Sequence, residues 1–209
     1  MTRIQRLLAA VVALTLTSNV AAAQRVTGAH PAATIPMPER LDTTGLFLQR
    51  FAKVGDDLFI AGQPTERGLR ELKARGVTTI VNLRTPPEMA RIGFDEPALI
   101  SQLGMTYVYL PVRGDSTMPY TPATVARFAE VLKSANGKVA LHCTVAWRAS
   151  HLWAAYLIKD RGVDIPTALA NARAINLGDL DMKMPMAGRQ PVEDFLNQDL
   201  PQLGRGKAP

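Results

Sequence analysis

The chain has 209 residues, of which 47% are hydrophobic and 20% are charged, a balance that fits one globular domain with short tails. Its formal net charge is +6, but the basic residues are scattered and form no block of five or six, which argues against nucleic-acid binding. Its single cysteine, Cys143, excludes an internal disulfide, so this thiol is either buried and inert or kept for its chemistry.

The N-terminus has the pattern of a secretory signal peptide. The first six residues carry two arginines and no acid, and an apolar run of eleven residues follows at Leu7–Thr17. Ala21 and Ala23 form the small-x-small pattern of a cleavage site, and the apolar run is shorter than the roughly 20 residues that span a bilayer. The alternative is an N-terminal membrane anchor. We expect a signal peptide over 1–23 and a mature chain of net charge +4, periplasmic or secreted, with no stable membrane insertion after cleavage.

The mature chain is expected to hold one domain. Residues 24–44 are rich in proline and show no apolar period, which is typical of a flexible lead-in. Residues 201–209 are similar and predict a tail. The domain itself is expected over 45–200, with no internal repeat and no second domain.

Within the domain, short apolar runs alternate with helical patterns. Strands alternating with helices predict an α/β fold of three layers, with a central, mostly parallel sheet and flanking helices. The expected elements, in chain order, are strands over 46–54 and 58–61, a helix from a Thr65 cap to Gly76, a strand over 77–83, a helix over 95–103, a strand over 105–112, a helix from Thr121 to Gly137, a strand over 138–142, a helix from near Arg148 to Gly162, and a helix over 165–175.

The most informative segment is KVALHCTVAWRASHLWAAYL, residues 138–157. An apolar strand carries Cys143 to its C-terminal end, four residues follow, and Arg148 then begins a helix. In open α/β sheets ligands bind at the carboxyl ends of strands, and a loop that enters a helix directs N–H groups and the helix dipole at one point. Such a place stabilises a thiolate, and an arginine can bind two oxygens of a phosphate. One short segment therefore offers a nucleophile and an anion site.

This segment resembles the signature of cysteine-dependent protein tyrosine and dual-specificity phosphatases, in which His-Cys, a short loop and Arg follow one another. That loop usually has five residues, whereas the four found here match rhodanese-type loops and a bacterial dual-specificity-phosphatase-like group called beta-lactamase hydrolase-like (DUF442). LFIAGQPTERGLRELKARGVTTIVNLR at 58–84 and EPALISQLGMTYVYLPV at 96–112 are similar to that group's N-terminal signature and next helix–strand unit. The resemblance covers about residues 46–178.

The resemblance implies a cysteine phosphatase-like fold and a phosphocysteine mechanism without a cofactor. Cys143 would attack phosphorus, Arg148 and the loop amides would hold the phosphoryl oxygens, and Asp115, the only acid of VRGDSTMPY, would be the general acid. His142 would orient the loop and stabilise the thiolate. The expected substrate-binding residues are His142, Thr144, Val145, Ala146, Trp147, Ala149, Ser150 and Arg84.

The loop departs from the resembled family at three positions. Ala146 stands where the family usually has glycine, and if this position needs a positive φ, alanine is strained there by roughly 1 kcal/mol. Ala149 replaces the usual Ser or Thr after the arginine, although Ser150 follows it. Trp147 places a large ring inside an anion-binding loop. These departures bear on turnover rather than on the fold.

Structural roles remain open for the same residues. Cys143 could be a buried small hydrophobe, His142 a core hydrogen-bonding residue, and Asp115 a plain turn residue. A structural Arg148 is disfavoured, because a cation at a helix N-terminus needs an anion nearby. Arg84 could face the site or bind a helix end. His30 and His151 show no metal-ligand spacing, so we expect no metal.

The sequence therefore predicts an exported phosphatase that hydrolyses a phosphomonoester on a phosphorylated small molecule or phosphoprotein. One alternative is a rhodanese-like sulfurtransferase, because a four-residue loop can hold a persulfide. The other is a non-catalytic module that binds an anion or a phosphopeptide, which Ala146 and Trp147 favour. Asp115 discriminates the first two, because a phosphatase needs a proton donor and a sulfurtransferase does not.

Overall fold

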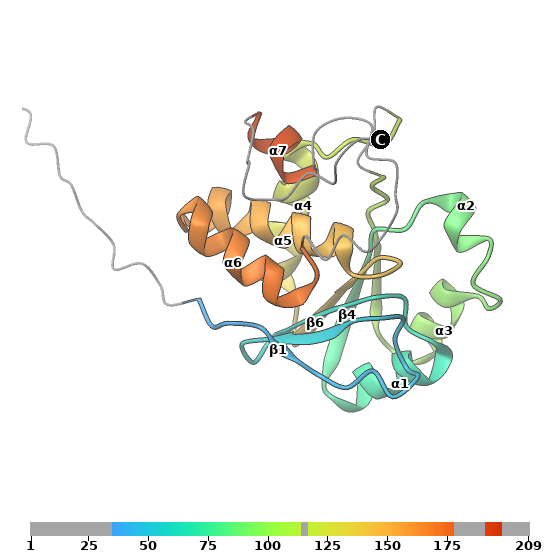
Figure 1. Ribbon diagram of the computed structural model, residues 1–209. Helices are drawn as coiled ribbons and strands as arrows, with labels where there is room; N and C mark the ends of the chain where they lie inside the picture. Colours follow the sequence, from blue (N-terminus) through green and yellow to red (C-terminus); the bar gives the residue numbers. More distant parts are fainter. Residues whose placement is uncertain (1–34, 114–116, 178–190, 198–209) are drawn as a thin grey trace, which may run out of the picture. The chain divides into compact units, whose positions relative to one another are not determined.

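A six-stranded sheet lies at the centre of the computed structural model, which describes residues 35–113, 117–177 and 191–197 (Figure 1). In spatial order the strands are β1 (Glu39–Arg40), β2 (Phe51–Val54), β3 (Leu58–Ala61), β6 (Lys138–His142), β4 (Val77–Asn82) and β5 (Thr106–Tyr109). The pairings β3–β6, β6–β4 and β4–β5 are parallel, whereas β1 and β2 add an antiparallel edge. The predicted mostly parallel sheet is confirmed.

Helices cover both faces of this sheet, which makes the three layers that the sequence predicts (Figure 1). One face carries α1 (Glu66–Ala74) and α3 (Glu96–Gln102), and the other carries α4 (Pro122–Ser134), α5 (Trp147–Asp160) and α6 (Ile165–Ile175). The short α2 (Pro86–Met89) follows β4, and α7 (Pro191–Leu196) packs on α5.

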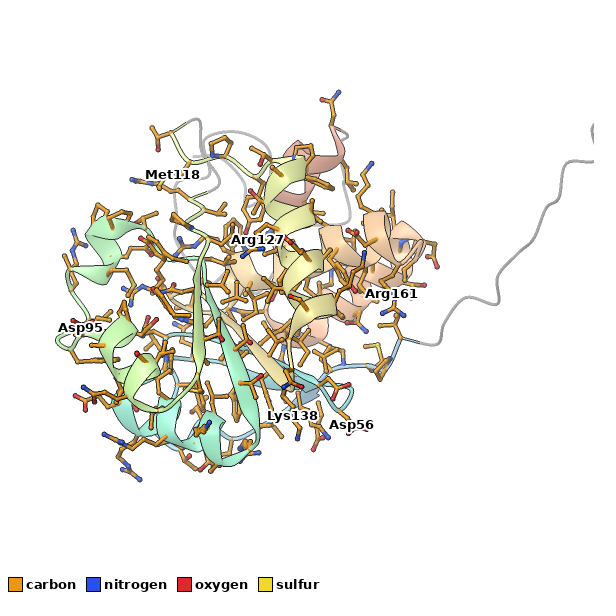
Figure 2. All side chains as sticks on the ribbon, turned by 180° about the vertical axis from the view of Figure 1, so that it is seen from behind. Asp56, Asp95, Met118, Arg127, Lys138 and Arg161 are labelled. Atoms are coloured by element: carbon orange, nitrogen blue, oxygen red, sulfur yellow. The ribbon has the colours of Figure 1, made fainter. Side chains whose placement is uncertain are left out.

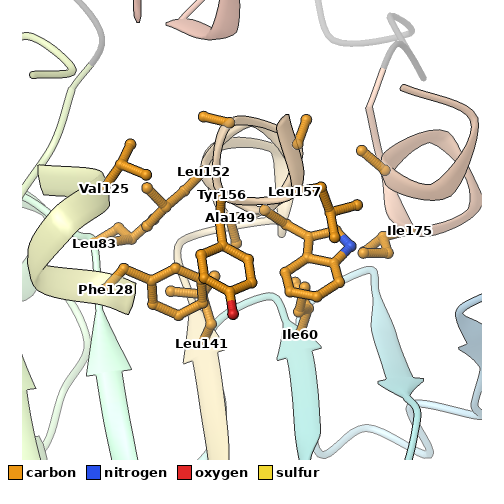
Figure 3. Packing of buried hydrophobic residues seen from close by; sticks show 14 of the residues in the cluster. Ile60, Leu83, Val125, Phe128, Leu141, Ala149, Leu152, Tyr156, Leu157 and Ile175 are labelled. Atoms are coloured by element: carbon orange, nitrogen blue, oxygen red, sulfur yellow. The ribbon is translucent and has the colours of Figure 1, made fainter. Parts of the chain in front are cut away.

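The inner strands β3, β6 and β4 are buried on both faces, so their residues alternate between two cores. On β6, Val139 and Leu141 belong to the core under α4, α5 and α6, whereas Ala140 belongs to the core under α1 and α3. Figure 3 shows Leu141 below side chains of α5 and beside Phe128 of α4. Successive side chains of a strand point to opposite faces of the sheet, so an apolar strand that helices cover on both sides contributes alternate residues to the two cores.

The helix starts follow the predicted capping chemistry. The Thr65 hydroxyl accepts a hydrogen bond from the Gly68 amide at 3.1 Å, and Thr121 accepts from the Thr124 amide at 3.2 Å before the proline that opens α4. Helix α6 has the predicted bounds, Ile165–Ile175.

The parallel register brings four strand ends to one edge of the sheet. Ala61 pairs with His142, His142 with Asn82, and Asn82 with Tyr109, so β3, β6, β4 and β5 end at the same level. Lys138 begins β6 at the opposite end, where Figure 2 shows it beside the turn that follows β2. The segments that leave the aligned ends, including the one at Cys143, therefore converge on one site.

Several boundaries differ from the sequence prediction. The strand expected over 46–54 begins only at Phe51, because Gln49 has a φ of 63° and the chain is not extended there. The strand expected over 105–112 covers Thr106–Tyr109. Residues 39–40 form β1 and pair with β2, although the sequence predicts a flexible lead-in over 24–44. The sequence did not predict α2 or α7.

The predicted signal peptide over 1–23 and the predicted tail over 201–209 lie outside the described residues. In the part of the chain that the structure describes, no helix combines the length and the apolarity needed to cross a membrane.

Gly62 should resist substitution because backbone passes close to it. A Cβ atom there would lie 1.8 Å from the Leu48 carbonyl oxygen and 3.0 Å from the Thr144 carbonyl oxygen. We expect Gly62→Ala to lower the free energy of unfolding by about 3 kcal/mol. In the control Gly93→Ala the space is open but φ is +78°, so the loss should be about 1 kcal/mol. Urea denaturation measures both, and equal losses would contradict this account.

Candidate active site

The predicted strand–loop–helix is present. Strand β6 ends at His142, Cys143 follows with 1% of its surface exposed, and α5 begins at Trp147. Ala146 has a φ of 65° and a ψ of −2°, so this position does need the left-handed conformation. Alanine adopts it at a cost of about 1 kcal/mol, as the sequence predicts.

Hydrogen bonds from three elements fix the curled loop. The Thr144 carbonyl oxygen accepts from the Gln63 amide at 2.9 Å. The next two carbonyl oxygens accept from side chains: that of Val145 from Asn176 Nδ2 at 2.5 Å, and that of Ala146 from Ser150 Oγ at 2.8 Å. The first amides of α5 have no carbonyl partner within the helix. The loop is therefore held from behind while a row of N–H groups stays available to an anion.

Arg148 is buried, with 7% of its surface exposed, and its guanidinium is oriented by groups from three segments. Nη1 donates to the carbonyl oxygens of Val112 at 2.7 Å and Leu83 at 3.3 Å, and to Glu88 Oε2 at 2.9 Å. Nη2 donates to Glu88 Oε1 at 2.5 Å and to Thr144 Oγ1 at 3.1 Å. No described residue accepts a hydrogen bond from Nε. Glu88 thus occupies the Nη1–Nη2 end, and because Nη2 also donates to Thr144, the Nε–H is the donor that is left to bind an oxyanion.

Glu88 is itself fixed by three donors besides Arg148. Its Oε2 accepts from the amide and the hydroxyl of Thr85 at 2.8 and 2.7 Å, and its Oε1 accepts from Thr144 Oγ1 at 2.6 Å. Burial opposes ionisation, but the hydrogen bonds from Arg148, Thr144 and Thr85 prevail and lower the pKa of Glu88 to about 2. Glu88 is therefore an ionised partner of Arg148 rather than a proton donor.

His142 lies behind the loop and contacts Glu96, which is fully buried. The His142 Nε2–H donates to Glu96 Oε1 at 3.1 Å, and the same carboxylate accepts from Asn82 Nδ2 at 2.9 Å and Gln63 Nε2 at 2.5 Å. Burial opposes ionisation of Glu96, yet His142 and Gln63 hold its pKa below the ordinary value. This network fixes the His142 ring directly before Cys143.

Arg84 joins the two carboxylate clusters. Its Nη1 donates to Gln63 Oε1 at 2.6 Å and its Nη2 donates to the Glu88 carbonyl oxygen, in the last turn of α2, at 2.8 Å. Burial lowers the pKa of Arg84. Of the two roles left open by the sequence, the structure shows the bond to a helix end.

A pocket of about 310 Å³ opens over the loop. Its lining residues are Thr85, Pro87, Glu88, Arg91, Arg113, Cys143, Thr144, Val145, Trp147 and Arg148. The described lining carries three arginines and one glutamate, and that glutamate is paired with Arg148. The net positive charge of the lining suits an anionic ligand.

The expected site residues divide into four groups. Cys143, Thr144, Val145, Trp147 and Arg148 line this pocket. His142, Ala146, Ala149 and Ser150 are buried and do not line it, and Arg84 lines a neighbouring pocket. Asp115 lies outside the described residues.

Sequence reasoning missed Glu88, Glu96 and Tyr120, whose hydroxyl donates to the Arg148 carbonyl oxygen at 2.6 Å. Only Glu88 had a readable signal, the Thr-x-x-Glu capping box that starts α2. His151 is fully buried, its Nδ1 accepts from the Val192 amide, and burial lowers its pKa to about 3. Within the described ranges no group of three His, Cys, Asp or Glu residues is placed to hold a metal ion.

Comparison with known proteins points to one family. The sequence profile described as DSP-PTPase phosphatase fused to NAD+ kinase matches residues 52–188. A beta-lactamase hydrolase-like protein of Xylella fastidiosa is 31% identical over 133 residues, which are 62% of this chain and 30% of that protein. One of Agrobacterium fabrum is 31% identical over 103 residues, 48% of this chain and 23% of that protein. The chain thus spans less than a third of these curated relatives.

Solved structures share the fold. A Shewanella putrefaciens CN-32 protein described as a DUF442 phosphatase superposes with a TM-score of 0.50 at 27% identity, over 61% of this chain and 80% of that one. P. aeruginosa TpbA, solved in complex with phosphotyrosine, superposes with a TM-score of 0.52 at 20% identity, over 69% of this chain and 80% of that one. These likenesses confirm the predicted architecture.

Glu88→Gln should destabilise the protein at neutral pH. The amide leaves the buried guanidinium of Arg148 without its counter-charge, and we expect a loss of about 2 kcal/mol. The folded-state pKa of Glu88 is below its ordinary value of 4.5, so the ionised carboxylate stabilises the fold above that value and stops doing so as pH falls through about 2. The difference between wild type and variant should therefore shrink from about pH 5 to pH 2.

Urea unfolding at a series of pH values measures this difference. The matched control is Glu130→Gln, because Glu130 pairs with Arg127 on the surface and is 64% exposed, where such pairs contribute little. A Glu88 effect that is no larger than the Glu130 effect, or that is independent of pH, would refute the assignment.

Proposed function

Because the chain belongs to the DSP-PTPase phosphatase family, we propose that it hydrolyses phosphomonoesters through a phosphocysteine intermediate on Cys143. The observation that carries the proposal is the Arg148 Nε–H, which has no acceptor among the described residues, in a pocket that Cys143 and Arg148 both line. A phosphoryl group bound to this N–H and to the amides of α5 would lie against the thiol.

In the proposed reaction the Cys143 thiolate forms a bond to phosphorus while the bond from phosphorus to the leaving oxygen breaks. Arg148 and the loop amides stabilise the charge on the transferring oxygens. Asp115 gives its proton to the leaving oxygen and then takes a proton from water. That water attacks phosphorus, releases inorganic phosphate and restores the thiolate.

Asp115 is proposed as this acid for two reasons. Among the described residues that line the pocket Glu88 is the only carboxylate, and its pKa of about 2 and its bonds to Arg148 make it unsuitable as a proton donor at neutral pH. Asp115 stands two residues after Arg113, which lines the pocket.

We propose a phosphorylated small molecule or a phosphoprotein as substrate. The pocket of about 310 Å³ is bordered by the apolar side chains of Pro87, Val145 and Trp147, which suit the organic part of a phosphomonoester. The phosphotyrosine bound to TpbA, a protein of the same fold, is consistent with an aryl phosphate.

Hydrolysis of p-nitrophenyl phosphate by residues 24–209 tests the function. We expect turnover that Cys143→Ser abolishes, and Arg148→Lys should weaken vanadate binding by about tenfold because an ammonium group cannot bind Glu88 and the oxyanion at once with the planar geometry of a guanidinium. Sulfur transfer from thiosulfate to cyanide is assayed beside it. Turnover of thiosulfate alone would identify a sulfurtransferase, and phosphate binding without turnover would identify a binding module.

We also propose that the protein is exported and cleaved after Ala23. The support is the arginine-containing start, the short apolar run and the alanine pattern of the first 23 residues. Mass spectrometry of the protein made in a bacterial host should show Gln24 at the N-terminus, free or cyclised. The control is Ala23→Leu, which should block cleavage, and a wild-type product that keeps its first 23 residues would refute the proposal.

A further inference from the structure

A second, larger pocket of about 860 Å³ adjoins the catalytic pocket, and Thr144 and Arg91 border both. Its lining residues are contributed by the segment before β2, the start of α1, the end of β4 and the segment between α2 and α3. A ligand whose phosphate is bound at Cys143 can therefore extend across Thr144 into this second pocket.

The charge of the second pocket is positive. Arg67, Arg84 and Arg91 line it together with one carboxylate, Glu66. Arg84 is committed to Gln63 and to the Glu88 carbonyl. The exposed side chains of Arg67 and Arg91 make no hydrogen bond or ion pair with any described residue, so their charges are available to a ligand.

The same pocket also offers apolar surface. Phe47, Leu48, Ile92 and Phe94 line it, and Leu48 is 49% exposed although it is a large hydrophobic residue. A polyol phosphate would leave these side chains without a partner, whereas a peptide can place both apolar and acidic side chains along one strand of backbone. The combination favours a peptide.

We propose that this second pocket, lined by Phe47, Leu48, Arg67, Arg91 and Phe94 among others, is a subsite for the residues that flank the phosphorylated residue of a phosphopeptide. An acidic side chain of the peptide binds Arg67, and an apolar one covers the exposed Leu48. An extended peptide advances about 3.3–3.6 Å per residue, so residues within a few positions of the phosphate reach the subsite. The inference rests on the proposed phosphatase function, because the phosphate anchors the peptide.

The test compares four substrates at low ionic strength: p-nitrophenyl phosphate, a phosphotyrosine peptide flanked by aspartates, the same peptide with asparagines, and a bisphosphorylated polyol. Wild type should show a kcat/KM about fivefold higher for the acidic peptide, the effect of one well-placed surface charge pair. Arg67→Ala should bring the two peptides to equality without changing p-nitrophenyl phosphate turnover. The preference should also fall as salt is added.

Arg70→Ala is the matched control, because Arg70 is exposed on the same helix, carries the same charge and does not line either pocket. It should keep the fivefold preference. A wild type that does not distinguish the peptides, an equal loss in both arginine variants, or a bisphosphorylated polyol that is hydrolysed better than either peptide would overturn the subsite.

A failure of the phosphatase proposal is read separately. If p-nitrophenyl phosphate is not hydrolysed, the affinity of the two peptides for Cys143→Ser, alone and combined with Arg67→Ala or Arg70→Ala, is measured by fluorescence anisotropy. A preference for the acidic peptide that only Arg67→Ala removes supports the subsite without catalysis. Equal affinities overturn it.

Discussion

The burial of the Arg148 guanidinium is the constraint that organises this end of the molecule. A buried cation costs several kcal/mol unless a counter-charge and hydrogen-bond acceptors surround it. Here the acceptors are Glu88 and the carbonyl oxygens of Leu83 and Val112, which lie in two segments, 83–88 and the one after β5, that are both distant from Arg148 in sequence. The chain can bury the arginine only when α2 and the segments that follow β4 and β5 take their observed places. The anion site is therefore formed before any ligand arrives.

Two carboxylates, the partly exposed Glu88 and the fully buried Glu96, support this site in different ways. Glu88 neutralises and orients the arginine, while Glu96 fixes the histidine before the cysteine. Arg84 and Gln63 connect them, since Arg84 bonds both to Gln63 and to the helix that carries Glu88, and Gln63 bonds to Glu96. A shift at one carboxylate must strain the other, so the cysteine and the arginine are held relative to each other by one hydrogen-bonded network.

What the sequence predicted well is local. The spacing from Cys143 to Arg148, the left-handed residue at Ala146 and the Thr65 cap all depend on a few consecutive residues. The fold class followed because apolar periodicity alternates between strand and helix. The pairing of Arg148 with Glu88 could not follow, because 60 residues separate them and only the parallel register brings them together.

The errors at the element boundaries have similar causes. Phe47 looks like a strand residue because it is large and apolar. In the structure it is buried, but it lies in an irregular segment whose β-pairing is a single isolated bridge to Pro64. Strand β1 is only two residues long, and α2 is only four, so neither shows a period. Elements this short are defined by their tertiary contacts rather than by their own sequence.

Ala146 shows how the loop tolerates its departure from the glycine of the resembled family. The left-handed conformation costs about 1 kcal/mol, but the alanine methyl is fully buried, and burying one such group stabilises the fold by about 0.8 kcal/mol. Ser150 adds two hydrogen bonds to the Ala146 carbonyl, from its amide and its hydroxyl. The loop thus keeps its curvature without glycine. What separates an enzyme from an anion-binding module on this scaffold is therefore the proton donor, not the shape of the loop.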